Sequence, residues 1–371
     1  MKVLKFGGTS VATSESLKLV VEIIKKSTKQ KQLVVVSALG GITNLLVEMA
    51  TAASSGEKNF KAHIKTVEDR HLAIILDFIP VTKQSGSISF LKSKINELES
   101  VLESLFTLKE LTSKSLAKIS SYGEILSSTI IYDLFKYQGI DVTLKDSRDL
   151  LFTQIVNDRE IIDHKKSSDK TQKFVKQETA AVIIVPGFIA SDENGDITTL
   201  GRGGSDFSAA LFANFIDASV LEIWTDVSGM FTAHPKLVSQ ALPIPKLSYH
   251  EAMELSHFGA KVIYPPTLQP IIEKEIPMLI KNTFDQDAAG TVIDSKGTIE
   301  GGNGTVVKGV SHIENVALVS LEGSGMIGIP GFSKRLFECL SNKKINIIMI
   351  TQASSEHSIC LGVRSEDAEV A

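Results

Sequence analysis

The stretch Lys2-Val3-Leu4-Lys5-Phe6-Gly7-Gly8-Thr9-Ser10 joins a short apolar strand to two glycines and two hydroxyl residues. Behind it, apolar residues recur at helical spacing between Leu17 and Ile24, and Ser14 is a candidate helix cap. A strand, a glycine turn and a helix in this order bring free backbone N–H groups and the positive end of the helix dipole to any ligand at the turn. A glycine pair after a strand is also common as a structural turn. The stretch by itself therefore predicts an α/β unit and leaves its function open.

The alternation of apolar runs and helical patterns continues along most of the chain, which predicts an α/β fold with a mainly parallel central sheet between helices. Residues 58–136 are almost wholly helical in pattern, with breaks at Pro80 and Gly86. They fit a coiled-coil surface or an inserted helical layer, and the interrupted repeat favours the inserted layer. Residues 192–196 contain the Asn-Gly pair of a tight hairpin. The expected strands are residues 2–6, 33–37, 142–144, 181–186, 220–225 and 278–281.

Composition excludes several classes of protein. The 371 residues predict two or three domains, and 43 acidic against 39 basic residues give a net charge of −4, which does not indicate a nucleic-acid binder. No apolar run has the length of a membrane span, and the apolar start is too short for a signal peptide. Two cysteines, Cys339 and Cys360, suit a reducing compartment. We therefore expect a cytoplasmic protein that binds neither nucleic acid nor membrane.

Two further clusters repeat the order of strand, glycines and helix. Residues 37–44 read Ser-Ala-Leu-Gly-Gly-Ile-Thr-Asn, and Gly201-Arg202-Gly203-Gly204-Ser205-Asp206 sets an arginine between glycines. Packing explains such an arginine poorly, whereas its planar fork binds a carboxylate or a phosphate with two hydrogen bonds. Loops after parallel strands meet at one edge of the sheet, so the three clusters should converge on anionic ligands. The chain has neither a Walker motif nor a protein-kinase catalytic loop, which suggests a phosphoryl-transfer enzyme of another class.

Six motifs in this order resemble those of one known family. They are residues 5–10, 37–44, 121–124, 199–206, 224–227 and 258–262. The chain resembles the aspartokinases of the amino acid kinase superfamily, and its helical insert looks closer to the bifunctional aspartokinase–homoserine dehydrogenases. The resemblance implies an amino-acid-kinase fold over residues 1–296. It also implies transfer of the γ-phosphoryl group of ATP to L-aspartate, giving 4-phospho-L-aspartate, the first step toward lysine, threonine and methionine.

The resemblance further implies roles for single residues. Lys5 and Asp206 are expected to be catalytic, Lys5 by offsetting the charge on the phosphoryl group. Arg202 is expected to bind the α-carboxylate of aspartate and Glu124 its α-ammonium, with Thr43 and Ser37 assisting. Glu124 could also be a solvated helix residue. The residues expected at the nucleotide are Lys5, Gly7, Gly8, Ser10, Thr225, Asp226, Phe231, Lys236 and Lys261.

Departures from the family pattern fall among the nucleotide residues. Phe231 and Lys236 stand where the family often has Tyr and Arg, and Tyr264 stands where it often has His. Phenylalanine can still stack on adenine, while lysine keeps the charge without the bidentate geometry of arginine. Mg²⁺ is expected through the ATP phosphates and water, with no metal site built from protein ligands.

A glycine-rich break at residues 297–304 precedes a segment with the pattern β-α-β-β. Its strands are expected at residues 316–321, 345–350 and 358–363, and its helix at residues 333–342. Residues 305–371 resemble an incomplete ACT regulatory domain, which implies a lysine or threonine effector and a homo-oligomer formed through this region. Because the whole domain needs β-α-β-β-α-β, we expect a fragment with weak or absent feedback inhibition. We also expect an uncovered apolar face that includes Ile347, Ile348 and Ile350.

Two other functions compete with this interpretation. Gly323-Ser324-Gly325-Met326-Ile327-Gly328 matches the Gly-x-Gly-x-x-Gly pattern of an NAD(P)-binding oxidoreductase, between a predicted strand and a predicted helix. Against it, too few residues follow for a dinucleotide-binding domain, Pro330 intrudes at the helix start, and no acidic residue closes the next strand. The other alternative is a non-catalytic amino-acid sensor. It is disfavoured because Lys5, Arg202 and Asp206 would then have no function.

Overall fold

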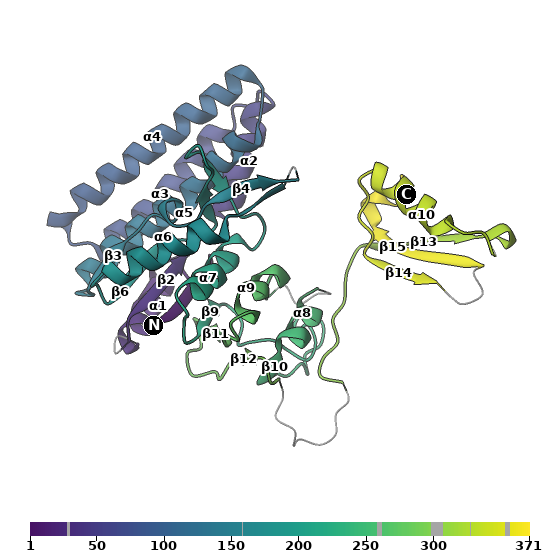
Figure 1. The fold of residues 1–371 in the computed structure, drawn as a ribbon. Helices are drawn as coiled ribbons and strands as arrows, with labels where there is room; N and C mark the ends of the chain where they lie inside the picture. The colour runs from purple at the N-terminus through teal and green to yellow at the C-terminus, as the bar shows by residue number, and fades with distance from the viewer. Residues whose placement is uncertain (28–29, 158, 258–261, 298–306, 327, 353–356) are drawn as a thin grey trace. The chain divides into compact units, whose positions relative to one another are not determined.

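The computed structural model describes residues 1–371 apart from 28–29, 158, 258–261, 298–306, 327 and 353–356 (Figure 1). The chain divides into two compact units, Met1–Ser311 and His312–Ala371. The glycine-rich break predicted at residues 297–304 lies, apart from Gly297, outside the described residues. Among the helices of the described residues, none has the length and apolar character needed to cross a membrane.

An eight-stranded sheet forms the centre of the first unit, in the order β10-β12-β11-β9-β1-β2-β6-β3. The six strands from β11 to β3 are parallel, and β12 runs antiparallel to β11. This confirms the predicted mainly parallel sheet, and its predicted strands begin and end at or next to the observed residues. The bounds are β1 (Lys2–Phe6), β2 (Gln32–Val36), β3 (Val142–Leu144), β6 (Val182–Pro186), β9 (Leu221–Thr225), β10 (Lys246–Ser248), β11 (Met278–Asn282) and β12 (Thr291–Asp294).

Helices cover both faces of this sheet (Figure 1). Those sharing a core on one face are α1 (Ser14–Lys26), α2 (Ile42–Ser54), α3 (Phe60–Phe78), α4 (Gln84–Leu108) and α5 (Ser113–Tyr137). The others of this unit are α6 (His164–Gln177), α7 (Gly204–Phe215), α8 (Tyr249–His257) and α9 (Gln269–Ile272). Successive side chains of a strand point to opposite faces, so Leu4 and Phe6 enter the core with α1–α5, whereas Val3 enters the core with α7. The same alternation puts Lys5 on the α7 face.

The predicted helical layer at residues 58–136 is confirmed as α3, α4 and α5, packed into the core of the first unit. Pro80 separates α3 from α4 as predicted, but the break predicted at Gly86 is wrong, because Gly86 lies inside α4. One glycine disfavours a helix by only ~1 kcal/mol, which packing of the long apolar stripe exceeds. The cap predicted at Ser14 is also displaced. Thr13 caps α1 by accepting from Ser16 N at 3.2 Å, and the Ser14 hydroxyl donates to Asp77 on α3 instead.

Two short hairpins complete the first unit, and their strands were not predicted. They are β4 (Thr153–Val156) with β5 (Arg159–Ile162), and β7 (Ile189–Ser191) with β8 (Ile197–Thr199). The Asn-Gly turn predicted at residues 192–196 joins β7 to β8, with Asp192 N donating to Asp196 O at 2.9 Å. Strands of three or four residues carry too few alternations to be recognised from sequence.

The second unit has the predicted β-α-β-β order. An antiparallel sheet in the order β13-β15-β14 packs against one helix. Its elements are β13 (Val316–Glu322), α10 (Phe332–Asn342), β14 (Met349–Gln352) and β15 (Ser358–Arg364). The strand expected from Ile345 begins only at Met349, because Ile345 N donates to Leu340 O at 2.9 Å and so still belongs to the end of α10, where its side chain enters the core. Ile350 is exposed as expected, whereas Ile347 and Ile348 are half-buried.

This arrangement excludes the dinucleotide-binding interpretation of the second unit. The residues after β13 form a short 3-10 turn, Ser324–Met326, and α10 begins only at Phe332. β13 pairs antiparallel to β15, whereas a dinucleotide fold needs a parallel strand after the helix. The Gly-x-Gly-x-x-Gly match is therefore accidental.

Candidate active site

Two glycine loops interlock at the carboxyl ends of β1 and β2: the first loop (residues 7–13) and the second loop (residues 37–41). Gly40 N donates to Gly8 O at 2.9 Å. A Cβ atom on Gly8 would lie 3.1 Å from Ala38 O, and one on Gly40 would lie 3.1 Å from Gly8 O. A side chain at either position would push the loops apart. The two glycines are thus explained by close contact between segments distant in the sequence.

The third loop (residues 200–203) leads into α7 and brings Asp206 to Lys5. Gly203 has a φ of +69°, a conformation that favours glycine, and Asp206 lies in the first turn of α7. Lys5 Nζ lies 2.5 Å from Asp206 Oδ1, and both side chains are largely buried. The carboxylate is favoured at this helix start by the dipole. An ion pair therefore joins β1 to the first turn of α7 and holds the lysine in place.

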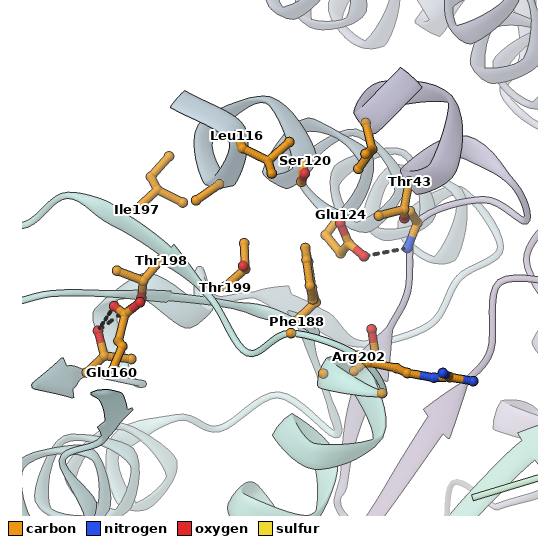
Figure 2. Close-up of a pocket in the computed structure, with 18 of the residues that line it drawn as sticks. Thr43, Leu116, Ser120, Glu124, Glu160, Phe188, Ile197, Thr198, Thr199 and Arg202 are labelled. Atoms are coloured by element: carbon orange, nitrogen blue, oxygen red, sulfur yellow. Dashed lines mark hydrogen bonds between the residues drawn. The ribbon is translucent and has the colours of Figure 1, made fainter. Parts of the chain in front are cut away.

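The three loops and α5 surround a cavity of about 920 Å³ (Figure 2). The hairpins β4–β5 and β7–β8 close other parts of its wall, through residues such as Glu160, Ile197 and Thr198. The predicted catalytic and substrate residues all line it; they are Lys5, Ser37, Thr43, Glu124, Arg202 and Asp206. The tertiary structure thus brings residues from four sequence motifs to one cavity.

Glu124 on α5 is a buried carboxyl group with a hydrogen-bond donor at only one of its two oxygens in the described part of the chain. Its side chain is 3% exposed, so the alternative of a solvated helix residue is wrong. Ala38 N donates to Oε1 at 3.3 Å (Figure 2), and no partner for Oε2 is found in the described part of the chain. Burial raises the pKa of Glu124 to about 8. A cationic ligand in the cavity would supply the missing donor.

Gly123 allows this carboxyl group to reach the second loop. A Cβ atom at position 123 would lie 2.7 Å from the Cβ of Ala38, closer than carbon atoms approach. α5 can therefore lie against the second loop only because this position carries no side chain. The two adjacent residues therefore act together: Gly123 allows α5 to pack against Ala38, and Glu124 accepts the hydrogen bond from Ala38 N.

Arg202 contributes a cation to the cavity wall from the third loop (Figure 2). Its side chain is exposed, and within the described residues it forms no salt bridge. A guanidinium without a protein partner can bind an incoming carboxylate with two hydrogen bonds. Ser37 lies beside the cavity with its carbonyl accepting from Ser127 Oγ at 2.8 Å, and Thr43 lies in the first turn of α2. Among the charged residues of the wall, Glu124 and Arg202 thus offer a carboxyl group and a guanidinium that form no ion pair within the described residues.

The residues expected at the nucleotide do not gather at the cavity as the catalytic and substrate residues do. Of the members of this set that the structure describes, Lys5 and Gly8 line the cavity. Ser10 is fully buried, and its hydroxyl contacts Trp224 O at 3.2 Å and Thr283 Oγ1 at 2.7 Å, so it connects the first loop to β9. Gly7 N donates to Trp224 O at 3.0 Å.

The other expected nucleotide residues start at Thr225, the last residue of β9, and those that the structure describes do not line the cavity. Thr225 Oγ1 donates to the exposed Asp226 at 3.2 Å. Phe231 is half-buried and Lys236 is exposed. Lys261 lies outside the described residues. The roles of these residues at ATP remain predictions.

One face of α5 contributes to the cavity in a way that was not predicted. Its lining residues are Ser113, Lys114, Leu116, Ala117, Ser120 and Glu124. Small and polar residues recur there every three or four positions, which is the spacing of one helix face. This stripe was visible in the sequence, but its meaning depended on what the helix packs against.

Comparisons with known proteins agree with this geometry. The amino acid kinase family matches residues 1–282, and an ACT domain matches residues 319–371. The chain is 35% identical over 368 residues to the chloroplastic bifunctional aspartokinase/homoserine dehydrogenase 1 of Arabidopsis thaliana, covering 98% of this chain and 40% of that protein. It is 32% identical over 367 residues to lysine-sensitive aspartokinase 3 of Escherichia coli, covering 97% and 77%.

A solved structure gives the same result for the fold. The crystal structure of E. coli aspartokinase III in complex with aspartate and ADP (R-state) matches with a TM-score of 0.76 and 25% identity, over 100% of this chain and 97% of that one. The predicted amino-acid-kinase fold and the ACT character of the segment after it are therefore confirmed, while the incompleteness of the ACT unit stays a prediction. The chain spans about 40% of the length of the plant bifunctional relatives it matches.

Proposed function

The chain belongs to the amino acid kinase family, among its aspartokinases, and from that membership we propose that it transfers the γ-phosphoryl group of ATP to the side-chain carboxylate of L-aspartate. One observation in the cavity supports this most directly. Glu124 has an unpartnered buried oxygen and Arg202 has an unpaired guanidinium in the described structure, and both line the same cavity. An α-amino acid carries the complementary ammonium and carboxylate groups. Its side chain could then extend toward Lys5.

The proposed reaction needs positioning more than acid or base chemistry. A side-chain oxygen of aspartate attacks the γ-phosphorus, the bond from that phosphorus to the bridging oxygen of ADP breaks, and ADP leaves with the electron pair. The attacking carboxylate is already ionised, so no proton has to be removed. Lys5 offsets negative charge on the phosphoryl oxygens, and Asp206 holds the ammonium of Lys5 in place.

Magnesium fits this site through one protein carboxylate. Asp206 provides hard oxygen donors beside Lys5, which is the ligand type that Mg²⁺ prefers. Among the described residues, no group of three or more His, Cys, Asp or Glu side chains forms a metal cluster. Mg²⁺ bound to ATP would neutralise phosphate charge, with Asp206 as the protein group able to contact its shell.

A coupled assay tests the proposed activity. The chain is incubated with MgATP and L-aspartate, and the acyl phosphate is trapped with hydroxylamine while ADP release is followed. We expect hydroxamate formation that requires both substrates. An amino-acid sensor would bind aspartate without forming hydroxamate, which would refute the proposal.

Replacing Arg202 by lysine should impair aspartate use much more than ATP use. Lysine keeps the charge but cannot bind a carboxylate with a planar fork, so we expect the KM for aspartate to rise ~10-fold or more, in line with a charged hydrogen bond worth ~1.5–3 kcal/mol. The KM for ATP should change by less than about twofold on the same basis. Steady-state kinetics with each substrate varied in turn would check this. A larger change for ATP would place Arg202 at the nucleotide and reverse the orientation of the site.

We further propose that the second unit binds a neutral amino acid such as threonine in preference to lysine. A cavity of about 310 Å³ there is lined by Met326, Gly328, Ile329, Pro330, Gly331, Phe332, Ser333, Gln352 and Ile359. None of these described lining residues is charged, so they offer the ε-ammonium of lysine no counter-ion, whereas the hydroxyl of Ser333 and the amide of Gln352 can hydrogen-bond a neutral polar side chain. Calorimetric titration of the chain with each amino acid should give tighter binding of threonine. Tighter binding of lysine would contradict the proposal.

The proposal extends to assembly and location. Leu318 on β13 and Met349 and Ile350 on β14 are exposed, and β13 and β14 are the outer strands of their sheet, which supports a homo-oligomer formed through this unit. Light scattering over a concentration series would test it. Cys339 and Cys360 are both free thiols, which supports a reducing compartment such as the cytoplasm.

A further inference from the structure

Arg70, on the inserted helix α3, hydrogen-bonds to both the first and the second loop and does not line the cavity. Its Nη1 donates to Gly40 O at 2.7 Å, and its Nη2 lies 3.5 Å from Ala12 O. These two carbonyls belong to loops that already contact each other through Gly40 N and Gly8 O. Within the described residues, Arg70 forms no salt bridge and does not line the cavity. Its hydrogen bonds therefore go to backbone groups of the site.

The hydrogen bond to Gly40 O fixes the orientation of the peptide group between Gly40 and Gly41. The peptide bonds of the described chain are trans, so the carbonyl of Gly40 and the N–H of Gly41 point in opposite directions. With the carbonyl held by Arg70, the Gly41 N–H is directed away from α3. Gly41 has a φ of +82° and lines the cavity. The peptide is thus held in an orientation that few residues other than glycine adopt.

Free N–H groups cluster at this point. In the described structure no partner is found for the backbone N–H groups of Gly41, Thr43 and Asn44, and all three residues line the cavity. They lie at the start of α2, where Gly41 gives no side-chain cap. Donors of this kind stabilise an anion when their direction is fixed before it binds.

We propose that Arg70 is a positioning residue that fixes the two glycine loops so that their free N–H groups face the phosphates of the nucleotide. It does this without contacting the ligand, by holding Gly40 O and Ala12 O on the far side of the loops. Its guanidinium also adds positive charge next to the Gly41 backbone, since a Cβ atom there would lie 4.0 Å from Nη1. This inference rests on the proposed phosphoryl transfer, and it assigns the helical insert a part in nucleotide binding.

Arg70→Met tests the inference, with Lys92→Met as its matched control. Lys92 lies on α4 of the same insert and pairs with Glu68 on α3, so its loss removes one cation and one ion pair without touching either loop. We expect Arg70→Met to weaken ATP binding ~10-fold by calorimetry and to lower kcat ~10-fold or more, because small displacements of positioning groups reduce rates strongly. Lys92→Met should stay within about twofold on the same reasoning. Arg70→Lys, which can reach one carbonyl only, should lie between.

The binding measurement separates positioning from folding. A purely structural loss would lower the active fraction while leaving the ATP Kd of the folded molecules unchanged. An ATP Kd within about twofold of wild type in Arg70→Met would therefore overturn the inference, whatever happens to kcat. A wild-type chain that binds ATP without phosphorylating aspartate would refute the proposed function, while the comparison of ATP affinities would still decide the role of Arg70.

Discussion

Replacing Lys5 by methionine should lower kcat by ~10²–10³, since one preorganised electrostatic group is typically worth ~3–4 kcal/mol of barrier. Methionine keeps much of the length of the side chain and removes its charge. Phosphoryl oxygens would then develop negative charge without the ammonium that the structure holds 2.5 Å from Asp206. The measurement is the initial rate of hydroxamate formation at saturating ATP and aspartate.

Lys2 on the same strand provides the control. Lys2→Met removes an equivalent charge and its 2.9 Å ion pair with Glu222, on the opposite face of β1 from Lys5. Its kcat should remain within about twofold of wild type. Activity of Lys5→Met within about threefold of wild type would remove Lys5 from the transfer site. Thermal unfolding of both variants shows whether either loss of activity reflects loss of fold.

The second large effect is expected at Glu124. Glu124→Gln removes the charge that would pair with the α-ammonium of aspartate, so kcat/KM for aspartate should fall ~10–100-fold, the range of a charged hydrogen bond. The KM for ATP should hardly change. Glu103→Gln, an exposed carboxylate on α4, is the control and should behave as wild type. A variant with an unchanged KM for aspartate would contradict the assignment.

The pH dependence of aspartate binding gives an independent readout. Burial raises the pKa of Glu124 to about 8, so in the free protein near neutral pH the group is largely protonated. Raising the pH from 6.5 to 8.5 should ionise it and lower the KM for aspartate in wild type, whereas Glu124→Gln should show no such trend. A wild-type KM that is flat over this range would contradict the predicted titration.

The free energy of unfolding of the ligand-free protein should fall as pH rises, whereas aspartate binding should improve. The pKa of Glu124 in the folded state lies above its ordinary value of 4.5, so between 4.5 and about 8 the folded state holds the extra proton. The stability linked to this proton is present below pH 4.5 and is lost as pH rises through about 8, a loss of roughly 2–5 kcal/mol. Glu124→Gln lacks this loss and should be the more stable protein at pH 8.5 without ligand. Urea unfolding at pH 6 and pH 8.5 would measure the difference, and equal pH dependence in both proteins would refute it.

The sequence by itself determined six of the eight strands of the main sheet, all but β10 and β12, and the polar loops that follow β1 and β2. Runs such as Val3-Leu4 and the pair Gly7-Gly8 specify a strand and a turn through neighbouring residues. Asp206 in the first turn of α7 was likewise predictable, because a helix start is a local signal. The hairpins β4–β5 and β7–β8 carried too short a pattern to be seen, although they line the cavity.

Only the tertiary structure decided which polar groups have partners. Glu124 meets Ala38 across 86 residues, Arg70 meets Gly40 across 30, and the Ser10 hydroxyl meets Thr283 across 273. As far as the structure describes the chain, these contacts leave one Glu124 oxygen without a partner, whereas the Ser10 hydroxyl has two. The physical reason is that backbone conformation follows from adjacent residues, whereas burial and hydrogen-bond partners depend on which distant segments pack together, and packing is a property of the whole core.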